Sequence, residues 1–294
     1  MFYMMNDRFD TAGASLDFLR RRIIRIVPLY WIATTMMLAS LIAAPQIIIH
    51  NGLDLKHVVA SYAFIPWPRA DGQLFPIHAL GWTLNYEMVF YAIFALALLL
   101  PLRAGLTTLV AIFALLILVG ALVPERLFIV KFWGDPIIGE FLLGIGIAGL
   151  YLSGRRLSAP VAIALILGGI ALAVVFFQIT AYEYVWRLIT GGIPAGLIVM
   201  AAVLGPSLRE SFPVRLLAVG GDASYALYLT HSFTIKLFGV VAIKLGLPLI
   251  LMYVLGFMLT ILASVPVHLF VEQPINHWLL RKTAKPKPAV SVAS

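Results

Sequence analysis

The stretch LSAPVAIALILGGIALAVVFFQITAY, from Leu157 to Tyr182, decides the fold class of this chain. It contains no Asp, Glu, Lys or Arg and is long enough to cross the hydrocarbon core of a bilayer as one helix. The stretch from Leu245 to Val271 has the same character. Over the whole chain 62% of residues are hydrophobic and 12% are charged, about half the charged share of an average soluble protein. This composition cannot cover a water-facing surface, which excludes a soluble domain.

Apolar runs of this kind recur along the 294 residues and predict an all-α, polytopic transmembrane helical bundle. We expect about eight spans, near residues 26–45, 78–100, 104–123, 136–153, 158–178, 188–206, 217–243 and 246–271. No internal repeat and no second domain is visible in the sequence. Residues 1–280 are therefore expected to form one membrane domain, and residues 281–294, rich in Pro, Lys, Ala and Ser, a disordered cytoplasmic tail.

The basic residues are distributed unevenly between the predicted loops. If the loops alternate between the two sides of the membrane, fourteen Lys and Arg residues share one side with both termini and six lie on the other. Because basic residues concentrate in cytoplasmic loops, both termini are predicted to be cytoplasmic. The net charge of +8 then reflects the helix ends, and no nucleic acid is expected as a partner. The long external loop, residues 46–77, carries Trp67 between two prolines, which predicts ordered turns.

Glu87 is the one charged residue between Gly72 and Leu102. It follows the predicted outer surface by about ten residues, or roughly 15 Å of helix, which places it near the middle of the membrane. On a helix it shares one face with Thr83 and Tyr91. Ionisable groups within a membrane are costly, so they are typical of functional sites. The alternative is a protonated carboxyl group that ties two helices together.

A second polar face is expected at Ser224, Tyr228 and His231, with Tyr225 nearby. His231 follows the cytoplasmic end of its span by about 20 Å of helix, a depth similar to that of Glu87. A Glu–His pair would be suited to proton transfer, because each partner shifts the pKa of the other. A single buried histidine bonded to a tyrosine or to a carbonyl group is an equally good interpretation.

A cluster of arginines precedes the first predicted span. Arg21 and Arg22 lie one helical turn before Arg25. A guanidinium group offers a planar pair of donors to phosphate oxygens, so the cluster predicts a phosphate site at the cytoplasmic face. The alternative is an anchor that fixes membrane topology, but lysine would serve that purpose equally well. The phosphate could also belong to a lipid headgroup.

No metal site is predicted. Cysteine is absent, which excludes disulfides, thiolate nucleophiles and cysteine-rich metal sites. His268 and Glu272 are four residues apart, yet one pair is two ligands short of a metal site, so Glu272 is interpreted as structural. Glu140 is a weaker candidate for a functional carboxylate within the membrane.

Four of these segments together resemble the bacterial acyltransferase-3 family of membrane O-acyltransferases. Residues 18–31, FLRRRIIRIVPLYW, resemble its FxxRRxxRIxPxYW motif, and residues 81–91, GWTLNYEMVFY, resemble its WSLxxExxFY motif. Residues 223–231, ASYALYLTH, are similar to its SYxLYLxH motif, and residues 271–274, VEQP, to its closing E-x-P. The form WTLNYE is similar to the branch that acylates bacterial exopolysaccharides.

The resemblance implies transfer of an acyl group, usually acetyl, from cytoplasmic acyl-CoA to a hydroxyl of an exopolysaccharide or a lipid-linked sugar. It implies a location in the bacterial inner membrane, membrane lipid as a partner, and no metal cofactor. By this likeness Arg21, Arg22 and Arg25 hold the donor, and Glu87 and His231 are catalytic. Residues expected to line the substrate path are Tyr91, Ser224, Tyr225 and Tyr228.

The sequence departs from the family at its start. The family normally has ten helices, and its first carries an Arg and a His that is the favoured general base. Met1 to Tyr3 resemble the end of the second helix, so the chain is expected to lack the first helix and most of the second. His50, His57 and His78 lie toward the external side and do not fill that role.

Two other classes of function remain open on the residues alone. A proton-coupled transporter or flippase for a glycolipid would use Glu87 and His231 as a relay, although no inverted repeat is visible. A non-catalytic membrane scaffold is the third interpretation, which the missing helices keep open.

Overall fold

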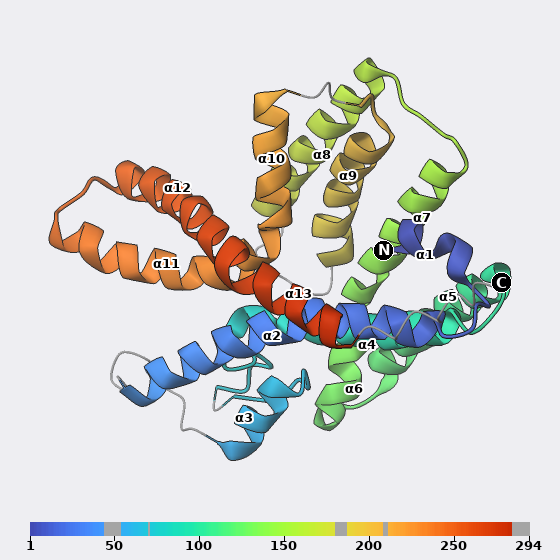
Figure 1. The fold of residues 1–294 in the computed structure, drawn as a ribbon, viewed down its shortest axis with the longest axis horizontal. Helices are drawn as coiled ribbons and strands as arrows, with labels where there is room; N and C mark the ends of the chain where they lie inside the picture. Colours follow the sequence, from blue (N-terminus) through green and yellow to red (C-terminus); the bar gives the residue numbers. More distant parts are fainter. Residues whose placement is uncertain (44–53, 70, 180–186, 208–210, 284–294) are drawn as a thin grey trace, which may run out of the picture. The chain divides into compact units, whose positions relative to one another are not determined.

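The computed structural model describes residues 1–43, 54–69, 71–179, 187–207 and 211–283, and within these ranges every regular element is a helix. This confirms the predicted all-α class (Figure 1). Six helical stretches among the described residues are long and apolar enough to cross a membrane: Ala14–Ala43, Leu102–Leu122, Glu125–Leu152, Ala159–Ile179, Ser224–Lys244 and Leu249–Lys282. Two shorter helical stretches, Trp82–Ala97 and Leu188–Leu204, coincide with further predicted spans. The chain is therefore a polytopic helical membrane protein.

The chain divides into two compact units, one of Met1–Leu19 with Asn51–Arg209 and one of Arg20–His50 with Glu210–Ser294. The first unit contains α1 (Phe2–Met5), η1 (Asn6–Arg8), the start of α2 (Ala14–Ala43), α3 (Leu55–Tyr62), η2 (Ala79–Gly81), α4 (Trp82–Ala97), α5 (Leu102–Leu122), η3 (Glu125–Leu127), α6 (Phe128–Trp133), η4 (Pro136–Ile138), α7 (Gly139–Leu152), α8 (Ala159–Ile179), η6 (Leu188–Gly192) and α9 (Ile193–Leu204). The second contains the rest of α2, then α10 (Phe212–Asp222), α11 (Ser224–Lys244), α12 (Leu249–Val267), η7 (His268–Glu272) and α13 (Gln273–Lys282).

Glycines set the close helix contacts of the first unit. A Cβ atom on Gly169 of α8 would lie 2.8 Å from the carbonyl oxygen of Pro194 on α9, and the two helices run side by side. A Cβ atom on Gly120 of α5 would lie 2.7 Å from the Cα of Gly134, which ends α6. Small residues let helix backbones approach in this way. The second contact matters for function, because it fixes α6 and the residues that follow.

Aromatic side chains pack along the buried face of α4. The rings of Phe90 and Phe94 lie 5.6 Å apart between centroids, and Phe94 also contacts Phe18 of α2 at 5.0 Å. The hydroxyl of Ser15 donates a hydrogen bond to the carbonyl oxygen of Ala95 at 2.7 Å. The start of α2 is thereby fixed against α4, the helix that carries Glu87.

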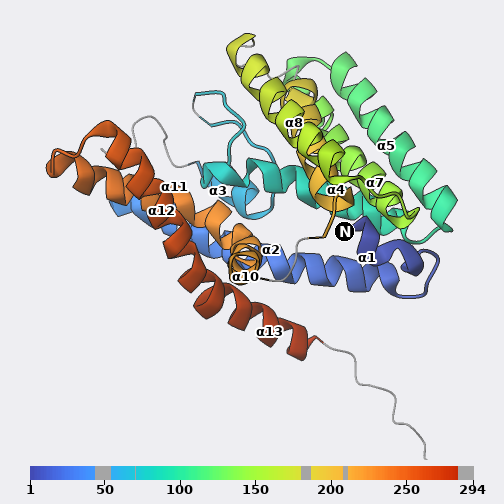
Figure 2. The same ribbon diagram turned by 90° about the horizontal axis from the view of Figure 1, so that it is seen from above.

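In the second unit α11 and α12 form a hairpin (Figure 2). Gly246 adopts a left-handed backbone (φ 63°) after the end of α11. The backbone N–H groups of Gly246 and Leu247 donate to the carbonyl oxygens of Ile243 and Ala242 at 3.1 Å each. This is the hydrogen-bond pattern with which a glycine closes a helix.

Several predicted boundaries are wrong. The first span was expected at residues 26–45, but α2 begins at Ala14, twelve residues earlier. The span expected at 217–243 is broken at Ala223, which separates α10 from α11. The helix of the final predicted span continues past Val271, because a π turn joins it to α13.

Two predicted loops also contain helix. Part of the predicted external loop is α3, whose N-cap Asp54 accepts a hydrogen bond from the N–H of Lys56 at 3.0 Å. The first two residues of the predicted tail belong to α13. The rest of the tail, residues 284–294, and residues 46–53 and 70 of the predicted loop lie outside the described residues.

Candidate active site

Glu87 lies in the middle of α4 and is joined to Tyr91 one turn later. The Tyr91 hydroxyl donates a hydrogen bond to Oε2 of Glu87 at 2.8 Å. The sequence predicted that both side chains share one face of the helix, and the contact follows from the i, i+4 spacing. Thr83, the third member of that face, donates to the carbonyl oxygen of Leu80 at 3.4 Å.

The Tyr91 ring is itself fixed by packing. It is 6% exposed and meets the edge of the Phe18 ring at 5.9 Å between centroids, with an interplanar angle of 85°. Phe18 begins the arginine-rich segment of α2, so two of the segments singled out in the sequence meet here. Because the ring cannot turn freely, the hydroxyl group stays directed at Glu87.

Glu87 lines a cavity of about 320 Å³ in the first unit. The other lining residues are Trp82, Thr83, Tyr86, Ile137, Glu140 and Phe141. Glu140, the weaker sequence candidate, thus faces the same cavity from α7. A half-buried carboxyl group at a cavity wall, held by a tyrosine, can accept a proton from a bound molecule or donate one to it. The position at a cavity wall is compatible with the predicted functional role of Glu87.

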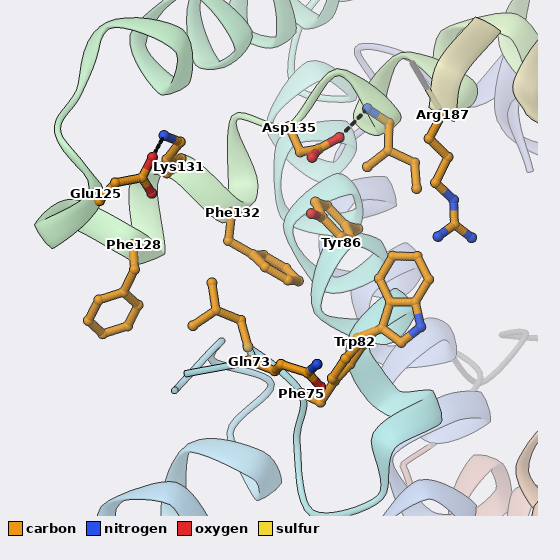
Figure 3. Close-up of a pocket in the computed structure, with 12 residues that line it drawn as sticks. Gln73, Phe75, Trp82, Tyr86, Glu125, Phe128, Lys131, Phe132, Asp135 and Arg187 are labelled. Atoms are coloured by element: carbon orange, nitrogen blue, oxygen red, sulfur yellow. Dashed lines mark hydrogen bonds and ion pairs between the residues drawn. The ribbon is translucent and has the colours of Figure 1, made fainter. Parts of the chain in front are cut away.

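A second cavity of about 390 Å³ adjoins the first and shares Trp82, Tyr86 and Ile137 with it (Figure 3). Sequence reasoning missed this cavity. Its residues come from segments far apart in the chain. The sequence feature that could have indicated it is the aromatic content of the predicted loops around Phe75 and Phe132.

The arginine cluster lies on α2 in the second unit. Arg21 and Arg25 are both exposed and lie one turn apart, so they present a pair of guanidinium groups on one face. Arg22 is half-buried. Arg20 has a structural contact, because its side chain donates to the backbone carbonyl and the hydroxyl of Thr283 at the end of α13.

Ser224, Tyr228 and His231 lie on one wall of a largely apolar groove of about 740 Å³ between α11 and α12. Nδ1 of His231 lies 2.8 Å from the carbonyl oxygen of Tyr228. A carbonyl oxygen can only accept, so Nδ1 carries the proton, and Nε2 of the neutral ring has a free lone pair. The arrangement suits a histidine that accepts a proton at Nε2.

Tyr225, which was expected on the substrate path, makes a contact between helices. Its hydroxyl donates to the carbonyl oxygen of Ile26 at 2.7 Å, which ties α11 to α2 within the second unit. Glu87 belongs to the first unit and His231 to the second. The pairing of these two residues therefore stays a prediction.

The closing segment forms a buried polar network on a π turn. Nδ1 of His268 donates to Oε2 of Glu272 at 2.8 Å, and both residues are less than 10% exposed. The amide of Gln273 donates to Nε2 of His268 at 3.0 Å. The contacts fit the structural interpretation of Glu272. Among the described residues, no group of three or more His, Asp or Glu side chains could hold a metal ion.

Comparison with known proteins defines the class. The model of an acyltransferase domain family, acyltransferase 3, matches residues 11–269, and the chain belongs to this family. With its transmembrane helices, it is a membrane O-acyltransferase. It is 34% identical over 260 residues to the exopolysaccharide production protein ExoZ of Rhizobium meliloti (strain 1021), covering 84% of this chain and 76% of that protein. No solved structure matches the chain significantly.

Proposed function

We propose that this chain transfers an acetyl group from cytoplasmic acyl-CoA to a hydroxyl of an exopolysaccharide or of its lipid-linked precursor, in the bacterial inner membrane. The observation that carries the proposal is the Glu87 carboxylate, which lines a cavity and is held by Tyr91, in a chain of the acyltransferase family. Support for the acceptor comes from the similarity to ExoZ, an exopolysaccharide production protein.

In the reaction the acceptor hydroxyl attacks the thioester carbonyl. A carbon–oxygen bond forms, the carbon–sulfur bond breaks, and the proton lost by the hydroxyl ends on the thiol of coenzyme A. Glu87 hydrogen-bonds the attacking hydroxyl and takes its proton, which is worth about a hundredfold or more in rate for a positioned base. His231, whose Nδ1 is held by the carbonyl oxygen of Tyr228, is proposed as a second proton acceptor through Nε2.

The donor is held by its phosphates. Arg21 and Arg25 present two exposed guanidinium groups one turn apart, and Arg22 extends the cluster. Such planar donors bind phosphate oxygens in pairs. By the predicted topology these residues face the cytoplasm, where acyl-CoA is found, and both termini lie on the same side.

A direct assay tests the proposal. Membranes that contain the protein are supplied with labelled acetyl-CoA and with deacylated exopolysaccharide from the producing cells, and label in the polysaccharide is counted. We expect transfer by the wild type and a loss of about a hundredfold or more in Glu87→Gln. The exposed Asp7→Asn is the matched control and should keep full activity.

The outcomes separate the three classes of function. Movement of a lipid-linked sugar across vesicles without labelled product would replace the proposal with a transporter. The absence of both acyl transfer and sugar movement would support the scaffold interpretation. Equal transfer by Glu87→Gln and the wild type would remove Glu87 from the mechanism.

A further inference from the structure

The larger of the two cavities in the first unit has the size of a small-molecule site. Its volume is about 390 Å³, within the range of roughly 300 to 1,000 Å³ that is usual for such sites. It is enclosed by the segment around Gln73, the first turn of α4 and the residues from η3 to η4 (Figure 3). The proposed donor site and proton path do not use this cavity.

Ordered contacts build the wall on the Gln73 side. Nε2 of His57 on α3 donates to the carbonyl oxygen of Phe75 at 2.9 Å, and the N–H of Ile77 donates to Oγ of Ser61 at 2.9 Å. The N–H of Gln73 donates to Oδ1 of Asp71 at 3.0 Å. The cavity is therefore largely pre-formed on this side.

Aromatic faces form most of the remaining wall. The rings of Tyr86 and Phe132 are stacked, with centroids 4.3 Å apart and an interplanar angle of 16°. Trp82, one turn before Tyr86 on α4, meets its ring at 90° and 5.9 Å. Figure 3 shows these three rings around a common space.

A small set of polar groups surrounds the rings. The Arg187 guanidinium lies 4.5 Å from the centroid of the Trp82 ring. Oδ1 of Asp135 accepts a hydrogen bond from the N–H of Ile137 at 2.8 Å, which leaves its second oxygen for another donor. Lys131 and Glu125 form an ion pair with each other at the rim.

This combination selects among ligand classes. A lipid chain would cover Arg187, Gln73 and the second oxygen of Asp135 without offering them a hydrogen-bond partner, which is costly. A pyranose ring satisfies both kinds of wall. Its C–H face, slightly positive, packs on the negative face of an aromatic ring, and its hydroxyls exchange hydrogen bonds with amide, carboxylate and guanidinium groups.

We propose that this cavity binds a glycosyl residue of the acceptor, stacked on Trp82, Tyr86 and Phe132 and held by Arg187 and Asp135. The inference rests on the proposed function, because it identifies the acceptor site of the same reaction. Trp82 and Tyr86 line both this cavity and the one that contains Glu87. A sugar hydroxyl that extends past Tyr86 therefore enters the space that Glu87 faces.

The predicted topology agrees with this assignment. Glu125, Lys131 and Arg187 fall on the side opposite to the arginine cluster of α2. The acceptor glycan then enters from the external side, and the acyl donor from the cytoplasm.

Binding to the purified full chain tests the inference. The probe is the deacylated repeat-unit oligosaccharide released from the exopolysaccharide of the producing cells, and its dissociation constant is measured by calorimetry in detergent. We expect Phe132→Ala and Arg187→Gln each to raise this constant at least tenfold, while the dissociation constant of acetyl-CoA stays unchanged. Phe132→Trp keeps an aromatic face at this position, so it should bind the oligosaccharide, unlike Phe132→Ala.

Two controls lie outside the cavity. Phe177→Ala removes an exposed ring on α8, and Arg126→Gln removes an exposed cation of η3. Both should bind the oligosaccharide as the wild type does. Unchanged binding in Phe132→Ala and Arg187→Gln overturns the inference, and so does an absence of oligosaccharide binding by the wild type.

The binding readout separates this inference from the proposed function. Oligosaccharide binding that depends on Phe132 and Arg187, in a protein that transfers no acetyl label, would overturn the proposed reaction and keep the glycan site. Acetyl transfer with normal dependence on oligosaccharide concentration in both variants would keep the reaction and overturn the site.

Discussion

The hydroxyl of Tyr91 donates a hydrogen bond to Oε2 of Glu87 at 2.8 Å across one turn of α4. The same tyrosine ring meets Phe18 of α2 edge to face. The orientation of the carboxylate thus depends on a packing contact with the helix that continues into the arginine cluster. Glu87 has a fixed direction before any substrate arrives, as its proposed catalytic role requires.

Removal of the Tyr91 hydroxyl should lower the rate of the chemical step. Tyr91→Phe keeps the ring and its contact with Phe18 but deletes the hydrogen bond to Glu87. Hydrogen bonds to charged groups contribute about 1.5 to 3 kcal/mol, so we expect kcat to fall about tenfold or more. The KM for acetyl-CoA should not change. A rise in that KM at constant kcat would instead place Tyr91 in donor binding.

Replacement of the exposed arginines should weaken the binding of the acyl donor. The double variant Arg21→Lys with Arg25→Lys keeps the charge and the topology but loses the paired planar donors. We expect the KM for acetyl-CoA to rise about tenfold, the equivalent of one charge-assisted hydrogen bond. Arg103→Lys, an exposed residue on the same predicted side, is the control. If the double variant behaves as this control does, the cluster only anchors the chain.

His231→Asn distinguishes a base from a structural histidine. The asparagine amide can still donate to the carbonyl oxygen of Tyr228, as Nδ1 does now at 2.8 Å. It offers no basic nitrogen in place of Nε2. We therefore expect a melting temperature close to that of the wild type together with a loss of activity of about a hundredfold. Retention of full activity would show that the hydrogen bond to the backbone is the whole role of His231.

The fold class and part of the site could be predicted from the sequence because they depend on local patterns. Long apolar runs determine membrane helices, and the i, i+4 spacing brings Tyr91 to Glu87. Other features depend on local geometry that the pattern does not encode. Hydropathy does not register the break at Ala223, because apolar residues continue on both sides of it.

The aromatic cavity could not be predicted for a different reason. Its lining comes from three segments far apart in the sequence, which carry Trp82, Phe132 and Arg187 and meet only in the folded chain, where α6 packs on α5. The exposure of Arg21 and Arg25, in contrast to the half-buried Arg22, likewise depends on how α2 packs. Contacts of this kind arise from tertiary structure, so local sequence patterns do not show them.

A pair of glycine substitutions tests the packing that fixes α6. A Cβ atom on Gly134 would lie 2.5 Å from the carbonyl oxygen of Leu116 and 2.6 Å from the Cα of Gly120, both backbone atoms of α5. Gly134→Ala must therefore push α6 away from α5. Overpacking of this kind costs about 1 to 3 kcal/mol, so the melting temperature in detergent should fall.

Gly144→Ala is the matched control within α7, because nothing lies within 4 Å of its added Cβ. Alanine favours a helix over glycine by about 1 kcal/mol, so this variant should melt at or above the wild-type temperature. The displacement of α6 in Gly134→Ala should also weaken oligosaccharide binding, since Lys131 and Phe132 move with that helix. Equal melting temperatures for the two variants would show that the α5–α6 contact does not hold the cavity in shape.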